Sequence, residues 1–410
     1  MPPTHGPLES DDRWVSLGHG TASLPEKLLL AHGQGRVLFI TGAGTSVPSG
    51  LPDFETLVLQ VYERLDTALH DQLVHPPASR PIPIPALSTQ QRAEMERFDR
   101  RDFDVVLGML ERRMDEHSDQ SQVRGAVYDV LRQVRSENND WVPPRPSSLH
   151  QALVKLADRG TARTIITTNF DTLLQRAKAK GSSSLATHTL GGMPRPTHRP
   201  EFSGVMHIHG VLPSITEKHS EIVVTDRDFG EFYLRRRVVP DFIYDAARLF
   251  SLVLVGYSAN DAPMRYLLNA VAADGVRFSD LKERYAFVGT NGSSEKIEVE
   301  LEDWKGRGIT PIPYADSNKH AQLAATLGRW AELSPINGKE RAVDSTIKRI
   351  VANSRSSTPQ EDRDLFDYLY RRGSSVERGR IAELPSVRSA SRDWLTAMSS
   401  IDRELSAVSN

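Results

Sequence analysis

The chain has 410 residues, of which 39% are hydrophobic and 25% charged, as in ordinary globular proteins with a large core. The formal net charge of −2 excludes a strongly basic chain, so nucleic-acid binding is not indicated, although a local basic patch is not excluded. Cysteine is absent, which excludes disulfides and cysteine-ligated zinc.

The sequence also lacks the patterns of targeting and membrane-spanning segments. Residues 1–30 do not combine a basic start with an apolar stretch, as a secretory signal does. No apolar run reaches the roughly 18 residues that a transmembrane helix requires. We therefore expect a cytoplasmic protein with no membrane partner.

Short apolar runs, partly β-branched, recur along the chain and predict buried strands. The first, Val37–Ile40, ends at Gly42, and a short apolar run bounded by glycine is typical of a strand in a parallel sheet. The later runs are Thr164–Thr167, Val205–Ile208, Ile222–Val224, Leu252–Val255, Tyr285–Val288 and a weaker one at Ile309–Ile312.

Helical patterns lie between several of these runs. One helix is expected near Leu24–His32 and another at Leu149–Asp158, with Ser148 as its N-cap and Gly160 as its C-cap. A third is expected at Met264–Ala272. Alternation of strands and helices predicts an α/β fold with a doubly wound parallel sheet.

Two regions depart from this alternation. Residues 55–147 read as a helical insertion with proline-rich breaks at 76–85 and 143–146, and residues 185–203 read as a loop. The predicted organisation is a domain of residues 1–335 containing the insertion, and a helical C-terminal tail of residues 336–410, separate from the core sheet, with helices at Arg363–Arg371 and Ser391–Leu405.

A glycine-rich loop follows the first strand. Glycine without a Cβ lets the backbone approach a pyrophosphate, and a following helix can offer its N–H groups. The loop has no lysine, so the nucleoside-triphosphatase pattern is not met. Taken alone, the Gly-x-Gly pattern predicts a tight turn equally well. The residues expected to hold a pyrophosphate are Gly42, Ala43, Gly44, Thr45 and Ser46.

The loop continues to Phe54, and residues 42–54, GAGTSVPSGLPDF, resemble the NAD-binding loop of sirtuins, GAGxSxxxGIPDF, with one Ile-to-Leu change. The resemblance implies a Rossmann-like fold that binds NAD. It also implies that Asp53 and Phe54 shape the nicotinamide side of the site, with Phe54 hindering return of the leaving group.

The segment Thr168–Asp171 follows the predicted strand Thr164–Thr167, at the end where open α/β sheets bind ligands. It resembles a sirtuin motif with an Asn and an Asp at a strand end, whereas helix capping is the alternative. The resemblance implies that Asn169 orients water or the ribose, and that Asp171 holds the ribose or orients Asn169.

A histidine pair ends the Val205–Ile208 run. The sequence His207-Ile208-His209-Gly210 resembles the sirtuin His-Gly that carries the general base, which makes His209 the catalytic candidate. Residues two apart share one face of a strand, so His207 is a second candidate for the same role. The alternative for either histidine is a hydrogen-bonded core or surface residue.

The loop after Leu252–Val255 resembles the GYSxxD form found in bacterial sirtuin-like proteins. It implies that Gly256, Ser258 and Asp261 contact the adenosine ribose. The alternative is a turn in which Asp261 caps the next helix, and Arg265, one helical turn later, can pair with Asp261.

Two departures from the family bear on activity. Sirtuin deacylases carry a four-cysteine zinc module that this chain lacks, and Glu55 stands where they usually have Arg. The resemblance therefore implies an NAD hydrolase of the bacterial antiviral-defence type, with NAD as substrate and no metal. The alternatives are a protein deacylase, an ADP-ribosyltransferase or a non-catalytic NAD or ADP-ribose sensor.

The same resemblance implies regulation by assembly, namely a homo-oligomer and a possible HerA-like hexameric ATPase partner. Apolar stripes in the insertion at 103–110 and in the tail at 366–370 and 394–398 are candidate interfaces. The alternative is that both stripes pack within the chain, the insertion stripe onto the sheet.

Overall fold

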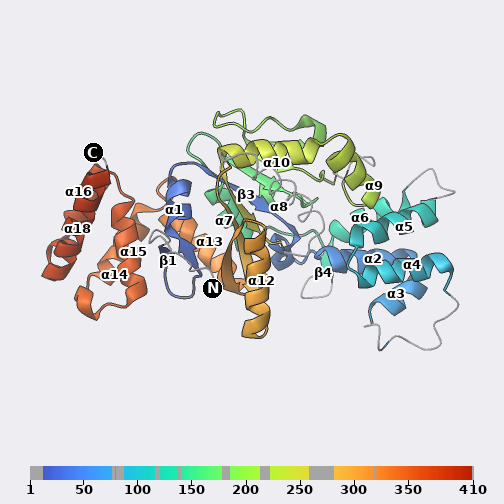
Figure 1. Cartoon of the computed structure of the whole chain (residues 1–410), viewed down its shortest axis with the longest axis horizontal. Helices are drawn as coiled ribbons and strands as arrows, with labels where there is room; N and C mark the ends of the chain where they lie inside the picture. Colours follow the sequence, from blue (N-terminus) through green and yellow to red (C-terminus); the bar gives the residue numbers. More distant parts are fainter. Residues whose placement is uncertain are drawn as a thin grey trace, which may run out of the picture.

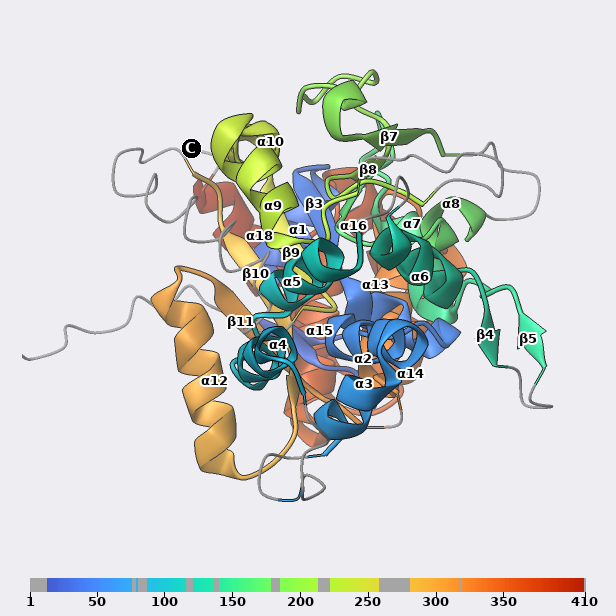
Figure 2. The same cartoon turned by 90° about the vertical axis from the view of Figure 1, so that its right-hand side faces the viewer.

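The computed structural model describes residues 13–75, 79, 87–115, 121–135, 140–177, 185–212, 222–257, 281–317 and 319–408. Figure 1 shows a central sheet with its helices, helices α2–α6 at one end of the molecule, and helices α14–α18 at the other. Figure 2 views the molecule from the α2–α6 end.

The central sheet of the described chain has seven strands, all parallel, in the order β11-β10-β9-β3-β6-β8-β7. The chain leaves β3 for β6 on one side and returns to β9 on the other, so the strand order reverses at β3. The strands are β3 Val37–Thr41, β6 Thr164–Thr167, β7 Thr187–Thr189, β8 Gly204–His207, β9 Ser251–Val255, β10 Arg284–Thr290 and β11 Thr310–Ala315. The doubly wound α/β fold is thus confirmed.

Strand β3 is buried on both faces, as its unbroken apolar run predicts. Val37 and Phe39 point into one core cluster, and Leu38 and Ile40 point into another, because side chains alternate along a strand. The first cluster includes residues of α1 Glu26–Gly33, α7 Ser148–Leu156 and α13 Ala321–Leu333, and the second includes residues of α10 Val238–Leu249 and α12 Ser294–Gly306.

The C-terminal helices are part of the first core cluster. Phe366 and Trp394 are fully buried in the cluster that contains Phe39 of the sheet, and Arg371 pairs with Glu26 of α1 at 2.5 Å. The prediction of a tail separate from the core sheet is therefore wrong, and its apolar stripes pack within the chain. These helices are α14 Glu340–Ile350, α15 Gln360–Arg371, α16 Ser375–Ala382, α17 Pro385–Arg388 and α18 Arg392–Val408.

The helical insertion has a core of its own. Val106, Leu107 and Leu110 are fully buried against Val58 and Tyr62 within one cluster. The apolar stripe at 103–110 thus packs within the insertion rather than onto the sheet. The insertion consists of α2 Phe54–Leu65, α3 Thr67–Leu73, α4 Thr89–Asp99, α5 Phe103–Asp115, α6 Gln122–Leu131 and the small hairpin β4 Val134–Arg135 with β5 Trp141–Val142.

The run Ile222–Val224 is buried but is not a strand, so that prediction is wrong. The N–H of Val223 donates to the carbonyl of His209, and the N–H of Val224 donates to the Asp228 carboxylate. These bonds replace a strand ladder. The apolar side chains fill the space between the insertion and the sheet, which explains a strand-like pattern without a strand.

Smaller differences concern element ends. Helix α7 has Ser147 rather than Ser148 as its N-cap, and Gly160 lies beyond its C-cap, with φ +83°. Strand β7 lies inside the predicted 185–203 loop, and α1 is preceded by the hairpin of β1 Trp14–Ser16 and β2 Ser23–Pro25. The predicted helix Met264–Ala272 lies outside the described residues. Within the described ranges, no helix combines the length and apolar character needed to cross a bilayer.

Candidate active site

The motif-bearing loops meet at one edge of the sheet, because parallel strands share the direction of their carboxyl ends. Strands β3, β6, β8 and β9 end there and lead into these loops. The loops and the insertion enclose a cavity of about 70 Å³. It is lined by Ala43, Ser46, Leu51, Pro52, Asp53, Phe54, Leu57, Leu131, Thr168, Asn169, Phe170, Asp171, His209, Val223 and Phe229.

The predicted glycines lie where the loops after β3 and β9 touch. A Cβ on Gly42 would lie 2.7 Å from the carbonyl oxygen of Gly256, and one on Gly256 would lie 2.5 Å from the backbone nitrogen of Thr45. Gly256 also has φ +76°, a conformation that favours glycine. These glycines allow the two loops to pack together, a role that the pyrophosphate argument did not include.

The backbone of the β3 loop is already hydrogen-bonded. The N–H groups of Gly42, Gly44, Thr45 and Ser46 donate to backbone carbonyls at 2.9, 3.1, 3.0 and 2.9 Å. The segment forms two short 3₁₀ turns, and an α-helix begins only at Phe54. The expectation of an α-helix N-terminus directly after the glycines is therefore wrong.

Asn169, Ser46 and Asp171 form one hydrogen-bonded group. The Asn169 amide nitrogen Nδ2 lies 3.0 Å from Ser46 Oγ, 3.1 Å from the Gly42 carbonyl and 3.2 Å from Thr45 Oγ1. Ser46 Oγ donates to Asp171 Oδ2 at 2.8 Å. Since the amide nitrogen faces the loop, the Asn169 oxygen Oδ1 is the atom suited to accept a bond from a ligand.

Asp171 is held by its own backbone turn as well as by Ser46. Its Oδ1 accepts from the N–H of Leu173 at 2.9 Å. Burial raises the pKa of the Asp171 carboxyl above its ordinary value, and these two hydrogen bonds oppose the rise. The N-cap of the following helix is Thr172, so Asp171 forms a turn just before that helix, and it also lines the cavity.

His209 lines the cavity from the end of β8 and is only 3% exposed. Its Nε2 lies 2.5 Å from the hydroxyl of Tyr233, and the ring of Phe229 stands edge-on to it with centroids 5.6 Å apart. Burial lowers the pKa of His209 from 6.5 to about 3, so the imidazole is neutral at pH 7.

His207 does not share the cavity lining with His209. Its Nδ1 donates to the carbonyl of Asn169 at 2.9 Å, and its Nε2 lies 2.7 Å from the Gln175 side-chain nitrogen. Both ring nitrogens are therefore engaged in holding the Asn169 loop and α8, Leu173–Arg176. Because β8 ends at His207, the period-two argument does not extend to residue 209, and the prediction of His207 as a second base is not supported.

Asp53 and Phe54 both border the cavity, and each has a structural contact as well. Asp53 is the N-cap of α2 and accepts from the N–H of Thr56 at 2.8 Å. The ring of Phe54 packs edge-on against Phe103 of the insertion, with centroids 6.1 Å apart. The loop is thereby fixed to the insertion at the mouth of the site.

The predicted site residues fall into three groups. Ala43, Ser46, Asp53, Phe54, Asn169, Asp171 and His209 are brought together around the cavity. Gly42, Gly44, Thr45 and Gly256 lie behind this lining, in the packed loops. Ser258 and Asp261 lie outside the described residues, as does Arg265.

Sequence reasoning missed several residues of the site. Tyr257 belongs to the recognised GYS motif, and its hydroxyl donates to the Thr41 carbonyl at 2.8 Å and lies 3.0 Å from Thr168 Oγ1. It joins the ends of β3, β6 and β9. Tyr233 comes from a separate element, and nothing in its local sequence indicates its contact with His209.

Among the residues that the structure describes, the lining contains two carboxylates and no lysine or arginine. Within the described ranges, no group of three or more histidine and acidic side chains is placed to hold a metal ion. Metal independence itself stays a prediction.

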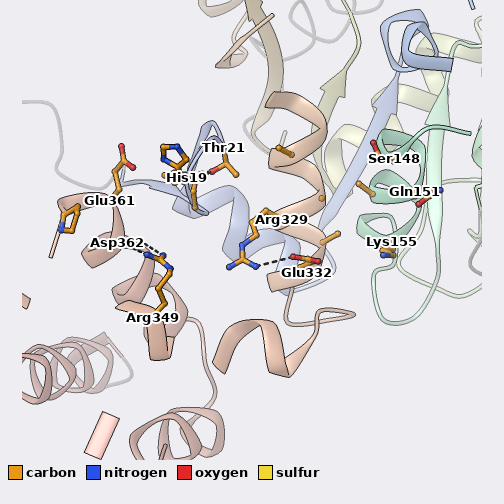
Figure 3. Close-up of a pocket in the computed structure, with 17 residues that line it drawn as sticks. His19, Thr21, Ser148, Gln151, Lys155, Arg329, Glu332, Arg349, Glu361 and Asp362 are labelled. Carbon is orange, nitrogen blue, oxygen red and sulfur yellow. Dashed lines mark hydrogen bonds and ion pairs between the residues drawn. The ribbon is translucent and has the colours of Figure 1, made fainter. Parts of the chain in front are cut away.

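A second, larger hollow of about 780 Å³ lies between the β1–β2 turn, α7, α13, α14 and α15. Figure 3 shows two pairs of charged side chains that face each other in it, Arg329 with Glu332 and Arg349 with Asp362. Arg329 pairs with Glu332 at 3.3 Å, and Arg349 pairs with Asp362 at 2.7 Å. None of the motif residues lines this groove.

Comparison with known families matches one part of the chain. Residues 163–312 match the family model described as the SIR2-like domain. The matched segment contains Asn169, Asp171, His209 and Gly256 and begins after the glycine-rich loop at residues 42–54. The chain thus contains a SIR2-like segment that carries most of the polar groups of the cavity.

Two similar proteins span different shares of the chain. An uncharacterized protein, y4cA, of Sinorhizobium fredii is 31% identical over 358 residues, which cover 85% of this chain and 27% of that protein. The chain therefore spans about a quarter of the length of this relative. Among solved structures, a mutant Sir2 homologue in complex with ADP-ribose is 17% identical, with 75% of this chain and 96% of that chain covered and a TM-score of 0.31.

Proposed function

Given the SIR2-like segment at residues 163–312, we propose that the protein binds NAD at the carboxyl edge of its sheet and hydrolyses it to nicotinamide and ADP-ribose. One observation carries the proposal. Asn169, Asp171 and His209, from two different strand ends, surround one cavity together with the Ala43–Phe54 loop. An NAD-depleting role in antiviral defence, which the sequence resemblance implies, is part of the same proposal.

Cleavage of the bond between nicotinamide and ribose requires no general acid. Nicotinamide in NAD is a pyridinium, so the electron pair of the broken C1′–N bond returns to the ring nitrogen and the base leaves neutral. Water must then attack C1′ of an oxocarbenium-like ribose and lose a proton. The site therefore has to position water, accept its proton and hold the ribose.

Asn169 is the residue proposed to position the water or the ribose. Its amide nitrogen is fixed on the Gly42 carbonyl, Thr45 and Ser46, which leaves Oδ1 directed away from the loop. Ser46 connects this amide to Asp171. Asp171, with its raised pKa, is suited to hydrogen bonding with a ribose hydroxyl.

His209 is the proposed general base. Its low pKa keeps the imidazole neutral, which is the form that accepts a proton. Water gives up a proton to His209 as its oxygen bonds to C1′, and the proton then passes to solvent. A base with so low a pKa is weak in the free protein, and the cationic nicotinamide ring beside it would lower that pKa further, so the barrier must fall chiefly through positioning.

The described cavity is smaller than the ligand it is proposed to bind. A volume of about 70 Å³ holds two or three water molecules, whereas ligand pockets typically have about 300–1,000 Å³. Leu131, Phe54 and Phe229 narrow it between the insertion and the sheet. NAD binding on this proposal thus requires the insertion or the β3 loop to move, and the apolar walls would then exclude bulk water.

Incubation with NAD alone tests the proposal. A hydrolase releases nicotinamide and ADP-ribose without any acceptor, a deacylase or ADP-ribosyltransferase needs its acceptor, and a sensor releases neither product. Replacing His209 or Asn169 by Ala is expected to lower the release rate by about 100-fold or more. Lys155→Ala, on the wall of the large groove, is the control and is expected to leave the rate unchanged.

Full release by folded His209→Ala and Asn169→Ala proteins would refute the assigned roles. We also propose that activity is independent of metal, so incubation with a chelator should change neither nicotinamide release nor thermal stability.

A homo-oligomer and an ATPase partner belong to the proposal as well. Light scattering of the full chain tests the first of these. Deletion of the tail is not a suitable test, because Phe366 and Trp394 are buried in the main core.

A further inference from the structure

His209 is held by a residue outside the motifs. Its Nε2 lies 2.5 Å from the hydroxyl oxygen of Tyr233, which is 5% exposed. His209 lines the cavity, whereas Tyr233 is not among the lining residues. The Nε2 edge of the imidazole is therefore directed to the layer behind the cavity wall.

The element that carries Tyr233 is unusual. Tyr233 lies on a π-helix, η5 Gly230–Arg235, which continues directly from α9 Asp226–Phe229. The rings of Phe229 and Tyr233 both stand edge-on to His209, with centroids 5.6 and 5.8 Å away. A π-turn is a rare form of helix that often occurs at functional sites.

We propose that Tyr233 is a positioning residue that fixes the tautomer of His209: its oxygen accepts the Nε2 proton and leaves Nδ1 as the nitrogen that receives the proton of the attacking water. This inference rests on the proposed function for its catalytic meaning. A neutral imidazole has one N–H and one bare nitrogen, so a donor bond at Nε2 makes Nδ1 the base.

The insertion determines where Tyr233 lies. Arg124 of α6 pairs with Asp228 at 2.8 Å and donates to the carbonyl of Ile222 at 3.0 Å, and Arg112 of α5 pairs with Asp226 at 3.2 Å. Both acidic residues belong to α9, whose last residue precedes the π-helix. The imidazole is thus oriented by an element that the insertion holds in place.

The test compares Tyr233→Phe with Tyr314→Phe. Tyr314 is a matched control, because it is 6% exposed, and its hydroxyl lies 2.9 Å from His320 Nδ1 at the far edge of the sheet. Nitrogen-15 NMR of histidine-labelled protein gives the tautomer of His209 directly, with His209→Ala used to assign its signals. Nicotinamide release gives kcat and KM for the same proteins.

The expected result has two parts. In the unmodified protein His209 is the Nε2–H tautomer, and Tyr233→Phe converts it to a mixture, while Tyr314→Phe leaves it unchanged. Tyr233→Phe lowers kcat by about 10- to 100-fold with KM within about twofold, because Tyr233 acts through His209 and not on NAD.

Either of two outcomes would overturn the inference. One is an Nδ1–H tautomer in the unmodified protein, and the other is a tautomer that stays unchanged in Tyr233→Phe, whether or not kcat falls. If the unmodified protein releases no nicotinamide, the proposed function fails, whereas the tautomer measurement still decides what Tyr233 does. Loss of activity with an unchanged tautomer would assign Tyr233 a purely structural role and also overturn the inference.

Discussion

The groove beside α13 and the cavity at the sheet edge differ both in volume and in the chemistry of the side chains that line them. The groove beside α13 has about 780 Å³ and the cavity at the sheet edge about 70 Å³. In the groove, the cations Arg329 and Arg349 are paired with neighbouring carboxylates, and the Arg349 side chain is 55% exposed. At the sheet edge, His209 and Asp171 have pKa values displaced by burial.

The comparison teaches that the chemistry of the lining identifies a site better than its size. The ion pairs of the groove are partly exposed and screened by water, so they contribute little to stability. The cavity at the sheet edge is lined by few polar groups. These groups come from separate strand ends and are held by hydrogen bonds of Ser46, Asn169 and Tyr233. Displaced pKa values of this kind are typical of functional sites.

Glycine substitutions are expected to give the largest difference in protein stability between the sheet-edge cavity and the groove. Gly256→Ala forces a Cβ to 2.5 Å from the Thr45 nitrogen at a φ of +76°, and is expected to lower the free energy of unfolding by about 3 kcal/mol. Gly328→Ala on the groove wall meets nothing within 4 Å and lies inside α13, so it should be neutral or stabilising. Urea unfolding measures both, and equal stability of the two variants would contradict the loop-packing account.

The next largest effect on stability is expected when a partly buried arginine and an exposed arginine are compared. Arg124→Ala removes bonds to Glu111, Asp228 and the Ile222 carbonyl, and is expected to cost about 2 kcal/mol of stability. Arg349→Ala, in the groove, is expected to cost less than about 1 kcal/mol. If both variants unfold at the same urea concentration, the insertion is not held to α9 as described.

A smaller effect is expected for the serines. Ser46→Ala removes the link between Asn169 and Asp171, and should lower kcat for nicotinamide release by about tenfold. Ser148→Ala, an exposed serine on the groove wall, serves as the control. An unchanged kcat in Ser46→Ala would show that the hydrogen-bonded group does not orient the Asn169 amide.

The smallest effect is expected for the dependence of kcat/KM on pH. His209 must be neutral to accept a proton, and its pKa in the free protein is lowered to about 3 by burial. Activity is therefore lost only as the pH falls through that value, and kcat/KM should stay flat from about pH 8 to about pH 5.5. A decline with a midpoint near 6.5 would mean that the base is an ordinary, exposed histidine.

The sequence predicts one part of the site well, for a physical reason. Strand ends share an edge in a parallel sheet, so motifs that follow strands must converge, and Ala43, Asn169 and His209 do so. The buried strands are equally predictable, because β3 and β9 are continuous apolar runs of the expected length.

Other features depend on contacts between residues distant in the chain. Tyr233 reaches His209 through a π-turn that no local pattern indicates, and the run Ile222–Val224 is buried by loop packing rather than by strand pairing. The apolar stripes of the tail identify a buried face, but only the structure identifies the sheet core as what covers them. An apolar stripe on a helix indicates that one face is buried, but it does not indicate which other element covers that face.

The most direct test of the central claim is a crystal structure of the His209→Ala protein grown with NAD. The account predicts NAD at the sheet edge, with its pyrophosphate against Ala43–Ser46 and its nicotinamide ribose beside Asn169, in a cavity widened by displacement of the insertion or the β3 loop. NAD bound instead in the groove between Arg329 and Arg349, with the sheet-edge cavity unchanged, would contradict it.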